Sequence, residues 1–238
     1  MRLDSYLCTF LGIESRNKAQ QLIRSGGVLV NSVLETKSSR KISPMDVVEQ
    51  TTSLRFVSRG GHKLEAALQA FSLSIEGYDC IDVGASTGGF TDCMLKHGAH
   101  QVFCIDVGQN QLHSSLLRHP QVHSVENTDI RDEFSIPFLS DFLAADLSFI
   151  SLSVCLNAIK RLMKPYSIGV FLIKPQFEAG LLGYKRDYIP LGEMRNKVIA
   201  HCIHNIENSG FSILGTIPSP VSGAKKGNIE ELIAVEKQ

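Results

Sequence analysis

The stretch Cys80–Thr91, Cys-Ile-Asp-Val-Gly-Ala-Ser-Thr-Gly-Gly-Phe-Thr, constrains the fold of this 238-residue chain more than any other. Ile81 and Val83 are β-branched and predict a short buried strand. Three glycines follow, which allow a sharp turn and let a ligand approach bare backbone. A helical pattern comes next. This order is typical of a nucleotide-cofactor loop at the carboxyl end of a parallel strand; a plain strand-to-helix turn is the alternative.

Asp106 ends a second apolar run, about twenty residues beyond the glycine turn, where a carboxylate can accept hydrogen bonds from ribose hydroxyls. A strict Gly-x-Gly-x-x-Gly is absent, because Ala85 and Ser86 follow Gly84. The Gly-Lys-Ser/Thr of a phosphate-binding loop is absent too. A polar, glycine-rich turn without a phosphate-binding lysine suits a cofactor that has no phosphate, such as S-adenosylmethionine.

The composition predicts a cytoplasmic protein with an ordinary core. Hydrophobic residues make up 43% of the chain, and no apolar run approaches the roughly 18 residues of a membrane span. The amino terminus lacks the apolar centre of a secretory signal. The six cysteines are scattered without a Cys-x-x-Cys pair, so neither disulfides nor zinc are expected. Two histidine pairs, at 97/100 and 201/204, lack acidic or cysteine partners at ligand spacing, and no metal is expected there either.

The net charge of zero conceals an asymmetry along the chain. Residues 1–62 contain nine Lys/Arg and five Asp/Glu, whereas the remainder contains fifteen and nineteen. A basic first quarter on a mildly acidic body indicates an appended nucleic-acid-binding module. Chance clustering is the alternative, since the excess is small.

The first fifty residues predict two helices followed by a small sheet. Apolar residues at helical spacing mark a helix over 2–11, and Ser15 is a suitable N-cap for a second helix. Strands are expected at 28–30 and 47–48. This order resembles the small RNA-binding module named after ribosomal protein S4. The resemblance implies that cations on the second helix and the following loop contact folded RNA: Arg16, Lys18, Arg24, Lys37, Arg40 and Lys41.

The rest of the chain predicts an α/β fold with a doubly wound sheet. After the two strands of the cofactor loop, strands are expected at 122–125, 142–146, 168–174, 211–214 and 229–235, and helices at 90–97, 110–118, 150–163 and 192–208. Ligands of such sheets lie outside the carboxyl ends of the strands.

Asp146 and Lys174 end neighbouring predicted strands. Lys174 is expected to leave a buried strand directly into a loop, and desolvation there would lower its pKa and let it accept a proton. In the alternative, Asp146 caps a helix and Lys174 extends to solvent.

The chain as a whole resembles the TlyA family, long labelled haemolysins and related to the FtsJ-type ribose 2′-O-methyltransferases of ribosomal RNA. The motifs that carry the resemblance are Ser58–Leu64, Asp82–Thr91, Ala145–Ser151, Ile173–Glu178 and Gly227–Glu230. It implies an S4-like domain over residues 1–50, a linker over 51–57, and a Rossmann-like, S-adenosylmethionine-dependent methyltransferase domain over 58–238.

The resemblance also implies the roles of individual residues. A catalytic tetrad falls on Lys63, Asp146, Lys174 and Glu230, with Lys174 taking the proton from a ribose 2′-hydroxyl. The residues implied to bind the cofactor are Asp82, Gly84, Ser86, Thr87, Gly88 and Gly89 on the methionine side, Asp106 at the ribose and Asp129 at the adenine. Lys185 and Arg186, in the loop 179–190, are implied to contact RNA.

The implied reaction is methylation of a cytidine ribose 2′-hydroxyl in ribosomal RNA. The short termini favour 23S rRNA and the 50S subunit, with 16S rRNA left open as an additional substrate. A non-catalytic ribosome-assembly factor that binds rRNA is the alternative, and a membrane-active haemolysin is a lesser one, since no membrane helix or export signal is visible.

Overall fold

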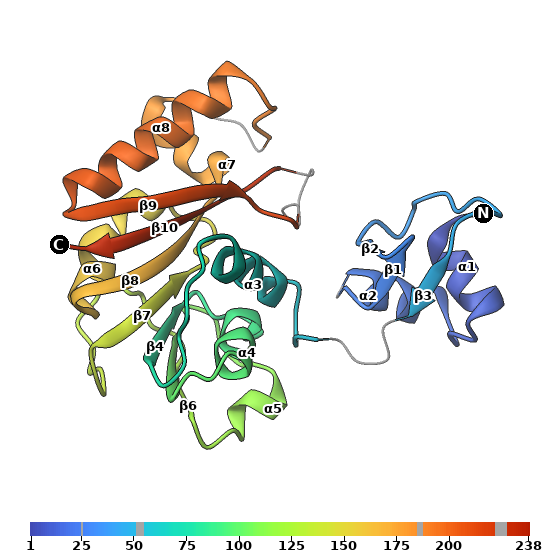
Figure 1. Cartoon of the computed structure of the whole chain (residues 1–238), viewed down its shortest axis with the longest axis horizontal. Coiled ribbons are helices and arrows are strands. Elements are labelled where there is room, and N and C mark those ends of the chain that lie inside the picture. The colour runs from blue at the N-terminus through green and yellow to red at the C-terminus, as the bar shows by residue number, and fades with distance from the viewer. Residues whose placement is uncertain (25, 51–54, 185–187, 222–227) are drawn as a thin grey trace. The chain divides into compact units, whose positions relative to one another are not determined.

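The computed structural model describes residues 1–24, 26–50, 55–184, 188–221 and 228–238, except the side chains of residues 21 and 24. The chain divides into two compact units, Met1–Arg59 and Gly60–Gln238 (Figure 1). Of the expected linker, residues 51–54 lie outside the described part of the chain.

The first unit packs two helices on a small antiparallel sheet. Its elements are α1 (Leu3–Phe10), α2 (Arg16–Arg24), β1 (Val28–Val30), β2 (Val33–Leu34) and β3 (Val48–Gln50), with strand order β2-β1-β3. Ser15 caps the N-terminus of α2 as expected, because its Oγ accepts a hydrogen bond from the Lys18 amide at 3.3 Å. Asn31 and Ser32 both have positive φ, at 55° and 62°. They form the tight turn that pairs β1 with β2, a strand that the sequence pattern did not predict.

The second unit is built on a seven-stranded sheet. Its strands are β4 (Asp79–Val83), β5 (Gln101–Ile105), β6 (Val122–Val125), β7 (Ser140–Ala145), β8 (Met163–Ile173), β9 (Phe211–Pro218) and β10 (Glu231–Lys237). The order is β6-β5-β4-β7-β8-β10-β9, and β10 runs antiparallel to both of its neighbours. The chain runs outward from β4 to β6 and then returns to place β7 beside β4. The carboxyl ends of β4 and β7 therefore form the switch point where ligands of such sheets bind.

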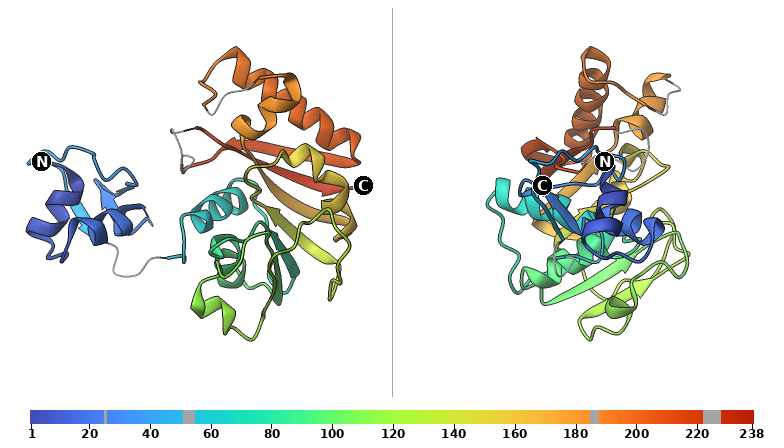
Figure 2. Two further views of the ribbon diagram at one scale, coloured as in Figure 1. Left: turned by 180° about the vertical axis from the view of Figure 1, so that it is seen from behind. Right: turned by 90° about the vertical axis from the view of Figure 1, so that its right-hand side faces the viewer.

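Helices cover both faces of this sheet (Figure 1, Figure 2). They are α3 (Gly60–Ala70), α4 (Gly89–Lys96), α5 (Ser114–Leu117), α6 (Leu156–Arg161), α7 (Pro175–Glu178) and α8 (Glu193–Asn208), with 3₁₀ turns η1 (Leu152–Val154) and η2 (Ala179–Leu182). Alternate residues of β4 and β7 point to opposite faces, and nearly all are buried. One face packs against α6 and α8, while α4 contacts β4 and β5, and α3 contacts α4 and β10. The expected α/β architecture is observed.

Two predicted helices are wrong in extent. The helix expected at 110–118 is reduced to α5, because the Glu126 carboxylate accepts the amides of Asn110 and Gln111 at 2.6 and 3.1 Å and holds them in a loop. The helix expected at 150–163 is split into η1 and α6.

Lys174 does not leave β8 directly into a loop; it precedes the single turn of α7, which begins at Pro175.

Candidate active site

The glycine-rich turn after β4 lies against the turn after β7. Gly84 has a φ of +81°, and a Cβ atom added there would lie 2.6 Å from the backbone oxygen of Asp146. Only glycine fits, both because the backbone is left-handed and because the neighbouring backbone is so close. The two turns therefore meet, and the residues that follow β4 and β7 are brought to one place.

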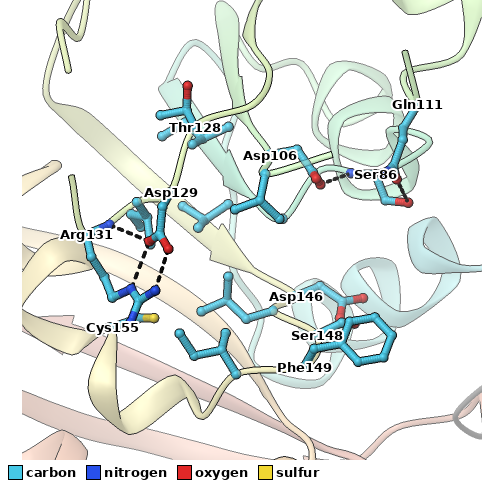
Figure 3. A pocket seen from close by; sticks show the side chains of 17 residues that line it. Ser86, Asp106, Gln111, Thr128, Asp129, Arg131, Asp146, Ser148, Phe149 and Cys155 are labelled. Carbon is cyan, nitrogen blue, oxygen red and sulfur yellow. Dashed lines mark hydrogen bonds and ion pairs between the residues drawn. The ribbon is translucent and has the colours of Figure 1, made fainter. Parts of the chain in front are cut away.

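A cavity of about 440 Å³ opens at this point, lined by residues that follow β4, β5 and β7 (Figure 3). Gly84 and Ser86 form part of its wall, together with Asp106. The Asp106 carboxylate accepts the amide of Ser86 at 2.7 Å and that of Gly108 at 2.6 Å. It thereby ties the glycine turn of β4 to the end of β5. The cavity has an open glycine backbone and a carboxylate at a strand end, which suits a nucleoside cofactor.

Asp129 lines the same cavity, on the side away from Asp146 (Figure 3). Its carboxylate accepts Arg131 Nε at 2.9 Å and Nη2 at 2.5 Å. These hydrogen bonds from the Arg131 side chain lower the pKa of Asp129 to about 2. The group expected to meet an adenine is thus an ionised acceptor already held by a guanidinium.

Asp82 does not line the cavity that Gly84, Ser86, Asp106 and Asp129 line. Its side chain is fully buried, and one carboxylate oxygen accepts the amide and hydroxyl of Thr91, at 2.8 and 2.6 Å. It therefore fixes the first turn of α4 to β4. Burial raises the pKa of Asp82 to about 7. Thr87, Gly88 and Gly89 likewise shape the start of α4, and none of these four is among the described residues that line the cavity.

The four residues of the expected tetrad come together from four separate elements. Lys63 lies on α3, Asp146 follows β7, Lys174 follows β8, and Glu230 precedes β10. The Lys63 Nζ atom lies 2.6 Å from Glu230 Oε2 and 3.6 Å from Asp146 Oδ2. The Lys174 Nζ atom lies 2.5 Å from Asp146 Oδ1. Charges of alternating sign thus form a continuous row, Glu230–Lys63–Asp146–Lys174.

Asp146 is the centre of this row and also lines the cofactor cavity. Burial would raise the pKa of Asp146, but the ammonium groups of Lys63 and Lys174 outweigh burial and hold that pKa below its usual range. Lys63, Lys174 and Glu230 are all less than a tenth exposed. The cluster is therefore a compact, largely desolvated group of two cations and two anions beside a cavity, an arrangement common at catalytic sites.

Sequence reasoning missed two residues that contact this cluster or its loops. Lys174 donates a hydrogen bond to Ser148 Oγ at 2.6 Å. Glu178, which is buried, accepts the Ser151 hydroxyl and the Leu152 amide at 2.6 Å each. It joins α7, which follows Lys174, to the loop that follows Asp146. Both residues lie inside motifs that carried the family resemblance, which was the signal available.

The expected RNA-binding cations of the first unit differ in exposure and in their ion-pair partners. Arg16, Lys37 and Lys41 are exposed. Lys18 pairs with Glu14, and Arg40 is bound to Glu35 at 2.8 Å. The side chains of Arg24, Lys185 and Arg186 lie outside the described residues.

The described ranges hold no group of three or more His, Cys, Asp or Glu residues arranged to bind a metal ion. None of the helices in these ranges combines the length and the apolar character of a membrane span.

Comparison with known proteins gives consistent matches over the whole chain. Residues 56–237 match the FtsJ-like methyltransferase family and residues 1–48 match the S4 domain. Hemolysin A of Brachyspira hyodysenteriae is 41% identical over 98% of both chains. The 16S/23S rRNA (cytidine-2′-O)-methyltransferase TlyA of Mycobacterium tuberculosis is 34% identical, over all of this chain and 90% of that protein.

Solved structures agree with these matches. A candidate hemolysin from Streptococcus thermophilus is 37% identical, with a TM-score of 0.72 over all of this chain and 88% of that one. The N-methyltransferase NodS from Bradyrhizobium japonicum, in complex with S-adenosyl-L-homocysteine, is only 15% identical. It has a TM-score of 0.55 over 75% of this chain and 88% of that one, and shows a shared fold.

The sheet order and the structural relatives define a Rossmann-like fold, and the match of residues 56–237 to the FtsJ-like methyltransferase family makes the chain a methyltransferase of that class. Within that class, the chain belongs to the TlyA family, in which an S4 domain precedes an FtsJ-like methyltransferase domain.

Proposed function

We propose that this protein transfers a methyl group from S-adenosylmethionine to the 2′-hydroxyl of a cytidine ribose in ribosomal RNA. The observation that carries the proposal is the Glu230–Lys63–Asp146–Lys174 row beside the cofactor cavity. The names of the relatives from Mycobacterium tuberculosis and Campylobacter jejuni, both rRNA (cytidine-2′-O)-methyltransferases, support the substrate. We expect 23S rRNA in the 50S subunit as the main substrate.

The cavity fits S-adenosylmethionine, which when bound supplies a methyl group on a positively charged sulfur. Gly84 exposes bare backbone there, and Asp106 presents a carboxylate at the end of β5 for ribose hydroxyls. Asp129, already ionised, would accept the exocyclic amine of the adenine. Of the glycine turn, Gly84 and Ser86 line the cavity and would contact the methionine part of the cofactor.

Lys174 is the proposed base. In its neutral form, its Nζ atom takes the proton of the ribose hydroxyl as that oxygen attacks the methyl group, so the hydroxyl proton ends on Lys174. Asp146, 2.5 Å away, orients Lys174 and stabilises the ammonium that forms. Lys63 forms a second ion pair with Asp146, and Glu230 holds Lys63 in place. Proton transfer of this kind contributes roughly 10²- to 10⁴-fold to the rate.

The surface next to Lys174 suits an unpaired nucleotide. Phe149 is 80% exposed and its ring centre lies 5.5 Å from that of Phe177. The Lys174 Nζ atom lies 6.0 Å from the centre of the Phe177 ring. Exposed aromatic faces stack on bases that have left a helix, which is how single nucleotides of folded RNA are presented to enzymes.

The test is transfer of radiolabelled methyl from S-adenosylmethionine to separated 50S and 30S subunits from cells that lack this protein. We expect label on 50S rRNA, and none with Lys174→Ala, which should still bind the cofactor. Lys164→Ala is the matched control, because Lys164 lies near the opposite end of β8 and pairs with Asp141. Near-normal turnover by Lys174→Ala would remove Lys174 from the mechanism. No label on either subunit, with cofactor binding intact, would favour a non-catalytic rRNA-binding factor.

A further inference from the structure

Asp4 is an acid buried in the first unit, where an isolated charge would be costly. It lies in the first turn of α1 and its side chain is 0% exposed. Arg2 donates to it through Nε at 3.0 Å and Nη2 at 2.8 Å. Arg16 Nη2 and Gln20 Nε2 donate to it at 3.1 and 2.9 Å. The Ser5 amide of α1 donates to it at 2.9 Å. One carboxylate thus receives donors from α1, from α2 and from the residue that precedes α1.

The Asp4 carboxyl is ionised in the folded protein. The hydrogen bonds from Arg2 outweigh burial and, with those from Gln20 and Arg16, hold the pKa of Asp4 far below its usual range. Asp4 is therefore an anion at all physiological pH values. The buried Asp4 carboxylate is bound by two guanidiniums and by the side-chain amide of Gln20, and these charge-assisted hydrogen bonds fix the positions of both guanidiniums.

The two arginines nevertheless remain available to a ligand. Their side chains are 44% exposed in Arg2 and 57% exposed in Arg16. A guanidinium has five N–H donors, and Asp4 takes two from Arg2 and one from Arg16. Among the described residues, no other acceptor binds either side chain. Each arginine can therefore hold Asp4 on one edge and an anion on another.

Lys41 is a third cation, held beside Arg2 by backbone pairing. Arg2 pairs with Lys41 in an antiparallel bridge, so their side chains lie on the same side. The Leu3 amide donates to the Arg40 carbonyl at 2.8 Å, which holds this segment in place. Lys41 is exposed. Three cations from separate segments, Arg2, Arg16 and Lys41, thus belong to one small surface.

We infer that Asp4 is a positioning residue for RNA binding: it holds Arg2 and Arg16 as a preformed pair that binds backbone phosphates of ribosomal RNA. The inference rests on the proposed function of this unit. Arginine binds phosphate through a planar fork, so orientation matters as well as charge. A side chain that is already ordered loses less freedom on binding. For two arginines, loss of this order should weaken binding about tenfold.

The decisive variant is Asp4→Asn in the full-length protein. The quantity measured is its affinity for purified 50S subunits. Its matched control is Glu14→Gln, in which an exposed acid that pairs with Lys18 loses the same charge. If charge alone mattered, both variants would bind RNA more tightly, because each removes one negative charge. If Asp4 positions the arginines, Asp4→Asn should instead bind RNA about tenfold more weakly than the unaltered protein. Glu14→Gln should bind RNA no more weakly than the unaltered protein.

A structural role for Asp4 is separated from a positioning role by a double-mutant cycle. In a protein that already carries Arg2→Ala and Arg16→Ala, Asp4→Asn should cause no further loss of affinity. An equal loss in that background would overturn the inference, as would affinity of Asp4→Asn equal to that of Glu14→Gln.

Should Asp4→Asn fail to fold, as judged by circular dichroism, Arg16→Lys provides the second variant. It keeps the charge but removes the fork, and should bind several-fold more weakly; unchanged affinity would refute the inference. If the unaltered protein binds cofactor but no 50S subunit, the proposed function fails and this inference with it. Failure of the Asp4 variants alone leaves the proposed function standing.

Discussion

The buried Asp82 carboxyl should make the stability of the methyltransferase unit fall as the pH rises toward neutrality. Burial raises its pKa from 3.8 to about 7. An acid whose pKa is higher in the folded state binds its proton more tightly there, so folding is favoured at low pH. This contribution is fully present below pH 3.8, the unfolded value, and is lost as the pH rises through about 7.

The magnitude follows from the number of protons bound. Between the two pKa values the folded protein holds one more proton than the unfolded chain, which costs about 1.4 kcal/mol of stability per pH unit. From pH 5 to pH 8 only the two units below pH 7 count, so the loss is about 3 kcal/mol. Asp82→Asn keeps an oxygen that can accept the donors of Thr91 but does not ionise, and should show no such loss.

The assay is urea unfolding of both proteins, followed by circular dichroism at pH 5 and pH 8. The difference between them cancels the other titrating groups. We expect Asp82→Asn to gain about 3 kcal/mol on the unaltered protein between these pH values. If the free energies of unfolding of the two proteins differ by the same amount at pH 5 and pH 8, Asp82 does not change its charge state on folding in this range. The argument from burial would then be refuted.

Three further predictions concern the candidate active site. Gly84→Ala should lose most of its cofactor affinity in calorimetry, because its Cβ would lie 2.6 Å from the Asp146 carbonyl oxygen; Gly180→Ala, where a Cβ meets nothing within 4 Å, should bind normally. Glu178→Gln should lower kcat more than it changes cofactor affinity, because the loops bearing Asp146 and Lys174 lose a shared anchor; equal changes in both would contradict this. Lys63→Ala should cost about 3–5 kcal/mol in urea unfolding, because two acids lose a buried partner, and adding Glu230→Gln should restore part of it; no recovery would argue against the pairing.

Local pattern was sufficient for most elements of the fold. Strands such as β1 and β6 fall where they were expected, and Ser15 caps α2 as expected. The errors have tertiary causes. The Glu126 carboxylate unwinds the start of the expected helix at 110–118, and the N-terminus of η1 is bound by Glu178, which lies 26 residues further along the chain. No window of neighbouring residues contains such partners.

The site divides in the same way. Motif spacing singled out Lys63, Asp146, Lys174 and Glu230, but their catalytic roles stay predictions, and nothing in the sequence says that their charges alternate along a row. The doubly wound α/β class needed only the periodicity of strands and helices, because those patterns reflect local backbone preferences. Lys63 meets Glu230 across 167 residues, and only the assembled sheet, with α3 beside β10, decides that contact. The burial that gives Asp82 its raised pKa likewise exists only once α4 packs on β4 and water is excluded.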